Sequence, residues 1–256
     1  MGGHAPPVFV MRWNRAAALL VALGLGCGVT TATGPEEELG EGTSVLFVGN
    51  SYLYFADVPG IVQALAEAAG GEKLAVATVA GPDMALVDHW NEGTAVRAIR
   101  DEAWRWVVLQ QGPSSVEINR DSLRLVTGWF NEEITRVGGQ AALFSAWPSA
   151  SRRQDFPRAI ESYALAAQDV DGLVLPVASA WLEAWERDPE LALYADGLHP
   201  NTLGAYLAAL VVYGRLLEAS PRGLPGSLRL RSGATISIPP AVAALLQEAA
   251  EAALAP

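Results

Sequence analysis

The sequence predicts an α/β fold in which a parallel β-sheet lies between two layers of helices. Short, continuous apolar runs alternate along the chain with longer segments whose apolar residues recur at helical spacing. The 256 residues, 51% of them hydrophobic and 18% charged, are also enough to bury one large core. Strands that alternate with helices at this spacing imply right-handed βαβ crossovers, and therefore a parallel sheet.

The elements follow one another in a regular order from residue 43 onwards. The predicted buried strands are Ser44–Gly49, Leu74–Val79, Trp106–Gln110, Gln140–Ala146 and Gly172–Val177. The predicted helices between and after them are Val58–Ala69, Thr94–Glu102, Asp121–Val137, Pro157–Gln168 and Thr202–Leu217. A strand-like stretch at Ala234–Ile238 and a helix opened by Pro239 and Pro240 form a tail, which we expect to pack on the main sheet layer.

The composition excludes several classes of function. The 17 Lys and Arg residues against 28 Asp and Glu give a formal charge of −11, which leaves no basic surface for nucleic acid. The single cysteine, Cys27, rules out an internal disulfide framework and a cysteine-based zinc site in the body of the chain. Because only His4, His89 and His199 are histidines, imidazole chemistry must use one of these three, and a metal site is not expected.

Residues 1–29 are predicted to be a signal peptide or a lipoprotein leader. The apolar run Ala16–Val29 follows Arg12 and Arg15, and it is shorter than the roughly 20 residues that a membrane-spanning helix needs. A compact leader that starts at Met11 fits this layout better than one that starts at residue 1. A buried core helix is the alternative interpretation of the run, but its flanks are more typical of a leader.

Cys27 lies at the end of the apolar run, where the acylated cysteine of a bacterial lipoprotein would lie. Lipidation there would anchor the mature chain to a membrane, although Gly24 departs from the usual lipoprotein pattern, so plain secretion stays an alternative. Residues 30–42 are acidic and contain glycine and proline, which predicts a linker, and residues 43–256 form the folded domain.

Chemistry is expected in the loops after the strands, because ligands bind beyond the carboxyl ends of parallel strands. Ser51 directly follows the first strand and can be a nucleophile whose own N–H helps to hold an oxyanion; a simple cap is the alternative. Asp196 stands three residues before His199, so it can accept from Nδ1 and leave Nε2 free to take a proton from serine. A surface turn is the alternative there. Gly81 and the loop Gln110–Ser115 reach the same edge.

With these residues the chain resembles the SGNH hydrolase superfamily, the GDSL-type esterases and lipases. Gly49-Asn50-Ser51 is similar to the first block with its nucleophile, Gly81 to the second-block glycine, and Asp196-Gly197-Leu198-His199-Pro200 to the last block, Asp-x-x-His. The resemblance covers roughly residues 43–217. It implies a three-layer α/β/α sandwich of flavodoxin type with a five-stranded parallel sheet, and ester hydrolysis through Ser51, His199 and Asp196 without a cofactor. The Gly-x-Ser-x-Gly elbow of α/β-hydrolases does not occur.

One block departs from the pattern of the superfamily. The third block, Gly-x-Asn-Asp, carries an asparagine that donates to the oxyanion, and Gly112-Pro113-Ser114-Ser115 stands in its place. Ser114 could donate through its hydroxyl, and Gln110 or Gln111 through a side-chain amide. The chain resembles a divergent branch in which Leu-Gln ends this strand, so Gln110 is favoured. The implied oxyanion hole is then Ser51, Gly81 and Gln110.

Three further residues have two interpretations each. Trp90 and Trp147 lie near the expected active edge and could stack on a sugar ring, or they could pack in the core. His89 could be a base or a substrate contact, although a histidine with local hydrogen bonds is the commoner case. Asn201 is expected to cap the last helix of the sheet region.

The sequence therefore predicts an exported serine esterase that is secreted, periplasmic or anchored to a membrane through lipidated Cys27. Its substrates would be carboxylic esters, acetyl esters among them, of carbohydrates or small molecules. An O-acyltransferase that uses the same three residues is an alternative. A surface-tethered glycan-binding module with weak or no catalysis is another, and the missing third-block asparagine is the feature that favours it.

Overall fold

The computed structural model describes residues 9–11, 42–71 and 73–255, and five parallel strands form the body of its sheet. These strands are β2 (Gly42–Gly49), β3 (Lys73–Ala80), β4 (Trp106–Leu109), β5 (Gln140–Phe144) and β6 (Leu173–Leu175). Their spatial order is β3-β2-β4-β5-β6. The predicted fold class is confirmed. β6 is shorter than predicted, because Pro176 has no N–H to donate to the sheet and α7 begins at the next residue.

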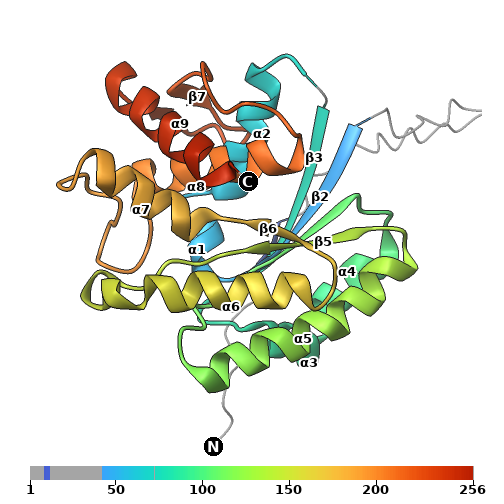
Figure 1. The fold of residues 1–256 in the computed structure, drawn as a ribbon. Helices are drawn as coiled ribbons and strands as arrows, with labels where there is room; N and C mark the ends of the chain where they lie inside the picture. Colours follow the sequence, from blue (N-terminus) through green and yellow to red (C-terminus); the bar gives the residue numbers. More distant parts are fainter. Residues whose placement is uncertain (1–8, 12–41, 72, 256) are drawn as a thin grey trace, which may run out of the picture.

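Helices cover both faces of the sheet, as Figure 1 shows. The chain moves from β2 to β3 in one direction and from β4 through β6 in the other, so right-handed crossovers place their helices on opposite faces. One layer holds α2 (Val58–Ala68), α7 (Val177–Arg187), α8 (Thr202–Leu216) and α9 (Pro240–Leu254). The other holds α3 (Leu86–Glu92), α4 (Thr94–Asp101), α5 (Glu117–Arg136) and α6 (Phe156–Gln168).

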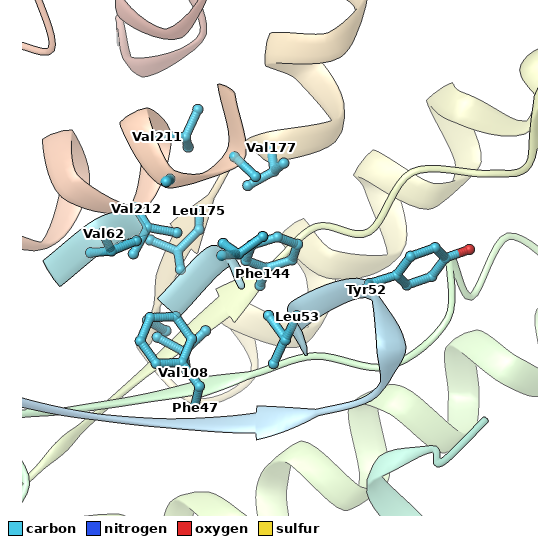
Figure 2. Packing of buried hydrophobic residues seen from close by; sticks show 14 of the residues in the cluster. Phe47, Tyr52, Leu53, Val62, Val108, Phe144, Leu175, Val177, Val211 and Val212 are labelled. Atoms are coloured by element: carbon cyan, nitrogen blue, oxygen red, sulfur yellow. The ribbon is translucent and has the colours of Figure 1, made fainter. Parts of the chain in front are cut away.

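The core lies between the sheet and these layers. Phe47, Val108, Phe144 and Leu175 come from β2, β4, β5 and β6, and all four are fully buried beside Val211 and Val212 of α8 (Figure 2). Strands covered on both faces need apolar residues on both faces, which explains why their sequences are continuous rather than alternating apolar runs.

A sixth strand, β1 (Phe9–Met11), pairs antiparallel with β3 at one edge of the sheet. It was not predicted, and it falls within the segment assigned to a leader. Apart from β1, residues 1–29 and the linker to residue 41 lie outside the described residues, Cys27 included. The leader, the linker and lipidation therefore stay predictions.

The C-terminal tail differs from the prediction in where it packs. β8 (Thr235–Ser237) pairs with β7 (Ser227–Arg229) in a separate two-stranded sheet, and α9 packs against α7 and α8 rather than on the main sheet. Pro240 is the first residue of α9, as predicted. Within the described ranges, no helix is both long and apolar enough to cross a membrane.

Short elements around the strand ends were not predicted: α1 (Ser51–Tyr54), α3 and the 3₁₀ helix η1 (Ala150–Asp155). The predicted cap of α8 is confirmed, because the Asn201 side chain accepts from the N–H groups of Leu203 and Gly204 at 2.9 and 3.0 Å. This cap fixes where α8 begins, three residues after His199.

Two helical glycines give a matched test of this packing. A Cβ added at Gly204 would lie 2.4 Å from the carbonyl oxygen of Leu193 and 2.8 Å from Trp181, whereas one at Gly128 of α5 meets nothing within 4 Å. We expect Gly204→Ala to lower the free energy of unfolding by about 1–3 kcal/mol through overpacking. Gly128→Ala should raise it by about 0.5–1 kcal/mol, since alanine favours the helix. Urea denaturation measures both, and a destabilised Gly128→Ala would contradict this account.

Candidate active site

Ser51 lies where β2 ends, at the switch point between β2 and β4, and it is the first residue of α1. Asn50 is the N-cap, and its Oδ1 accepts from the N–H of Tyr52 at 3.2 Å. Tyr52 and Leu53 are buried, whereas Ser51 is partly exposed. The capped turn therefore fixes the serine at the rim with its hydroxyl accessible.

The turn Asp196–His199 holds an aspartate against a histidine. Asp196 Oδ1 accepts from the N–H groups of Leu198 and His199 at 3.0 and 2.7 Å, and Oδ2 contacts His199 Nδ1 at 2.7 Å. Gly197 has φ +84°, in the left-handed region that glycine adopts without strain. Because a carboxylate only accepts, Nδ1 carries the proton. Nε2 of the neutral ring is then a free acceptor.

The Asp196 carboxylate stays ionised at any pH of interest. Its hydrogen bonds from the His199 ring, the His199 N–H and the Leu198 N–H lower its pKa from the usual 3.8 to about 2. The side chain is 49% exposed, so this arrangement concerns the orientation of His199 more than the stability of the fold.

Ser51 and His199 meet across the fold. His199 Nε2 lies 2.9 Å from Ser51 Oγ, although the two residues are 148 positions apart in the chain. Ser51, His199 and Asp196 thus form one series of hydrogen bonds at the carboxyl edge of the sheet. Such a series can move a proton from the hydroxyl to the imidazole while the carboxylate stabilises the positive charge.

The loop after β5 supports the turn that carries His199. Trp147 is fully buried and stacks on Trp181 of α7, with ring centroids 4.2 Å apart. Three hydrogen bonds then join the two loops: Trp147 Nε1 to the Leu198 carbonyl (3.0 Å), the Ala150 N–H to the Gly197 carbonyl (2.8 Å), and the Tyr194 hydroxyl to the Pro148 carbonyl (2.6 Å).

This burial corrects the interpretation of Trp147 as a sugar-stacking residue, whereas the same interpretation of the partly exposed Trp90 stays a prediction. Trp147 has no exposed surface with which to contact a ligand, and its role is to support the His199 turn. Trp90 on α3 is partly buried and packs against Trp129 and Phe130 of α5. No signal in the sequence separates such packing from a ring at a binding surface.

Gln110 is also corrected as an oxyanion donor. It is fully buried, its Nε2 donates to Asn50 Oδ1 at 3.0 Å and to the Gln111 carbonyl at 2.5 Å, and its Oε1 accepts from the Asn50 N–H at 2.9 Å. Both amide hydrogens are therefore used inside the protein. Gln110 instead holds the residue that precedes Ser51.

The other candidates from the β4 loop also face inward. Ser114 is buried, and its hydroxyl accepts from Gln111 Nε2 at 2.8 Å and donates to the Gly112 carbonyl at 3.2 Å. Gln111 Oε1 accepts from the N–H of Leu86 at 3.1 Å. The loop therefore packs behind Ser51, and it presents neither the Ser114 hydroxyl nor the Gln111 side-chain amide to a substrate.

Two backbone N–H groups are the other candidate oxyanion donors. The Gly81 N–H donates to the Gly49 carbonyl at 3.2 Å, which continues the pairing of β2 with β3 and leaves it unavailable in this conformation. The Ser51 N–H has no acceptor within the part of the chain that the structure describes. It is the donor best placed to meet a charge that develops on a group bound to Ser51 Oγ.

His89 lies beneath this site and does not face it. The ring is fully buried on α3, and its Nε2 donates to the Gly49 carbonyl at 2.7 Å; Nδ1 has no partner among the described residues. Burial lowers the pKa of His89, against the smaller opposing effects of the Gly49 hydrogen bond and of Asp88. His89 is therefore a buried helical histidine whose hydrogen bond holds the end of β2. The described residues contain no cluster of three His, Cys, Asp or Glu that could hold a metal ion.

A serine, a histidine and an aspartate hydrogen-bonded in series at one rim of a layered α/β fold is the arrangement of serine hydrolases. Several solved structures are similar to this chain in fold. A DUF4886 family protein from Bacteroides uniformis is 19% identical, with a TM-score of 0.67 over 83% of this chain and 94% of its own. A candidate SGNH hydrolase from Slackia heliotrinireducens is 26% identical, with a TM-score of 0.56 over 68% of this chain and 99% of its own.

An acetyl xylan esterase is 14% identical, with a TM-score of 0.55 over 68% of this chain and 99% of its own. No protein-family model and no curated protein matches the sequence. The chain has the fold of these proteins, as its motifs predicted, and its likeness to the candidate SGNH hydrolase supports the hydrolysis of ester bonds in general.

The buried imidazole makes stability depend on pH. Because the folded state lowers the pKa of His89 below its ordinary 6.5, the unfolded chain binds the proton first as the pH falls. The free energy of unfolding should therefore decrease below about pH 6.5, by at most about 1.4 kcal/mol per pH unit from this group. His89→Gln keeps a donor for Gly49 but cannot titrate. Urea midpoints at pH 7.5 and 5.5 should differ less for this variant than for the wild type; equal differences would contradict the burial argument.

Proposed function

We propose that this protein is an exported serine esterase in which Ser51 is the nucleophile, His199 the general base and acid, and Asp196 the residue that orients His199. The observation that carries the proposal is the continuous series of contacts, 2.9 Å from Ser51 Oγ to His199 Nε2 and 2.7 Å from His199 Nδ1 to Asp196 Oδ2. These are hydrogen-bond distances already suited to proton transfer.

In the first step Ser51 Oγ attacks the ester carbonyl carbon while His199 Nε2 takes the hydroxyl proton. Asp196 accepts the hydrogen bond from Nδ1–H throughout, which fixes the tautomer and stabilises the imidazolium. His199 then gives its proton to the alcohol oxygen, the bond from that oxygen to the carbonyl carbon breaks, and the acyl group stays on Ser51. Water, deprotonated by His199, releases the carboxylic acid by the same route.

The oxyanion is held first by the N–H of Ser51. The N–H of Gly81 can join it, because the Gly49 carbonyl that Gly81 now contacts at 3.2 Å also receives the shorter, 2.7 Å hydrogen bond from His89. Gly49 therefore keeps a partner when Gly81 turns toward the substrate. In this scheme two backbone N–H groups hold the oxyanion, whereas in the SGNH hydrolases a third-block asparagine side chain also donates to it.

Acetyl esters of carbohydrates are the substrates that we propose to test first. The likeness in fold to acetyl xylan esterases supports this choice, together with the predicted export of the chain. Lipidation of Cys27 would hold the enzyme at a membrane, and nucleic acid is not a proposed partner because the chain carries a net charge of −11.

Turnover of p-nitrophenyl acetate, followed by a panel of acetylated sugars, tests the proposal. Ser51→Ala should lower kcat by about 10⁴-fold or more, and Asp196→Asn by about 10⁴-fold because it favours the wrong tautomer. Both variants should unfold at nearly the wild-type urea midpoint, since neither side chain is buried. Full activity of folded Ser51→Ala would overturn the assignment. A wild-type protein that binds sugars but turns over no ester would favour the glycan-binding alternative.

A further inference from the structure

The one-turn helix α1 presents two exposed aromatic rings on the same side as Ser51. Ser51, Tyr54 and Phe55 stand at positions i, i+3 and i+4, which share a helix face, and the Phe55 N–H continues the turn by donating to the Ser51 carbonyl at 2.9 Å. Tyr54 is 38% and Phe55 51% exposed. Leu53, on the other side, points into the core near Phe144 (Figure 2).

The two rings differ in their contact with His199. The Phe55 ring lies flat against the His199 imidazole, with centroids 4.4 Å apart and planes inclined by 11°. Among the described residues Tyr54 has no ring contact with His199, and burial and then the Asp83 carboxylate raise the pKa of its hydroxyl. Exposing an aromatic ring to water is unfavourable. Two such rings beside a candidate nucleophile therefore offer apolar surface to a substrate.

The direction of the leaving group follows from proton transfer. His199 Nε2 must protonate the alcohol oxygen of the ester, so the alcohol part lies on the His199 side of Ser51. Phe55 lies on that side, stacked on the imidazole, and Leu198, which is 38% exposed, is adjacent to His199 in the chain. One face of the Phe55 ring is covered by the imidazole, and half of the residue's surface remains open to a ligand.

We propose that Phe55, with Leu198, forms the subsite for the alcohol part of the ester, and that this site selects esters whose alcohol presents a flat or apolar face. An aryl ring or the C–H face of a sugar ring can pack against Phe55, whereas a methyl or ethyl group makes little of this contact. The inference rests on the proposed function. It names the side of the substrate that the enzyme recognises and the residue that recognises it.

A purely orienting role for Phe55 makes a different prediction. If the ring only held the imidazole in place, its removal would slow the hydrolysis of every ester by the same factor. If it binds the alcohol part, its removal acts on esters with a ring-shaped alcohol and spares those with a small one. Tyr54 serves as the comparison, because it shares the helix face but has no ring contact with His199 among the described residues.

The experiment measures kcat/KM for a series of acetyl esters in which only the alcohol changes: ethyl, cyclohexyl, phenyl and a methyl xyloside. Wild-type protein is compared with Phe55→Ala, Phe55→Tyr and Tyr54→Ala. Ile118→Ala is the surface control, because Ile118 is 78% exposed on α5. Phe55→Ala should lower kcat/KM about tenfold or more for the three ring-shaped alcohols and less than about threefold for ethyl acetate. Phe55→Tyr should keep the wild-type preference.

Tyr54→Ala and Ile118→Ala should leave the order of alcohols unchanged. An equal loss for all four esters in Phe55→Ala, or the same change of preference in Tyr54→Ala, would overturn the subsite while leaving the esterase intact. A wild-type protein that hydrolyses none of the four esters or p-nitrophenyl acetate overturns the proposed function, and the subsite with it.

Discussion

A single hydrogen bond, from Ser51 Oγ to His199 Nε2, connects the two parts of the candidate site, and it depends on supports from both ends of the domain. Ser51 is fixed by the end of β2 and the Asn50 cap. His199 is fixed by its own turn, by the loop after β5 and by the start of α8 at Asn201. A shift of 1 Å in either support would lengthen the contact beyond the range of proton transfer.

Behind the serine, a buried amide network joins the end of β4 to the residue that precedes Ser51. Gln110 pairs with both the N–H and the side-chain oxygen of Asn50, so the end of β4 sets the position of the residue before the nucleophile. This pairing demands glycine at position 49, because a Cβ there would lie 2.3 Å from Gln110 Oε1. The glycine of the first block is thus explained by close approach of a neighbouring side chain.

The sequence was enough to predict the five parallel strands, the order of strands and helices and the Ser51, Asp196 and His199 candidates, since apolar runs and local spacing carry that information. It could not predict how Trp147 and Gln110 are oriented. An indole near a strand end packs in the core or lines a cleft depending on neighbours such as Trp181, and an amide at that edge turns inward when Asn50 offers it partners. Strand β1 and the position of α9 depend on long-range contacts that leave no local pattern.

The most direct test of the central contact is covalent labelling by a fluorophosphonate, which reacts with a serine hydroxyl only when a base activates it. Mass spectrometry of the intact protein should find one adduct, and peptide mapping should place it on Ser51. His199→Ala should slow the labelling by several orders of magnitude with the fold unchanged. No adduct on the wild type, an adduct on another serine, or equal labelling of His199→Ala would contradict the account.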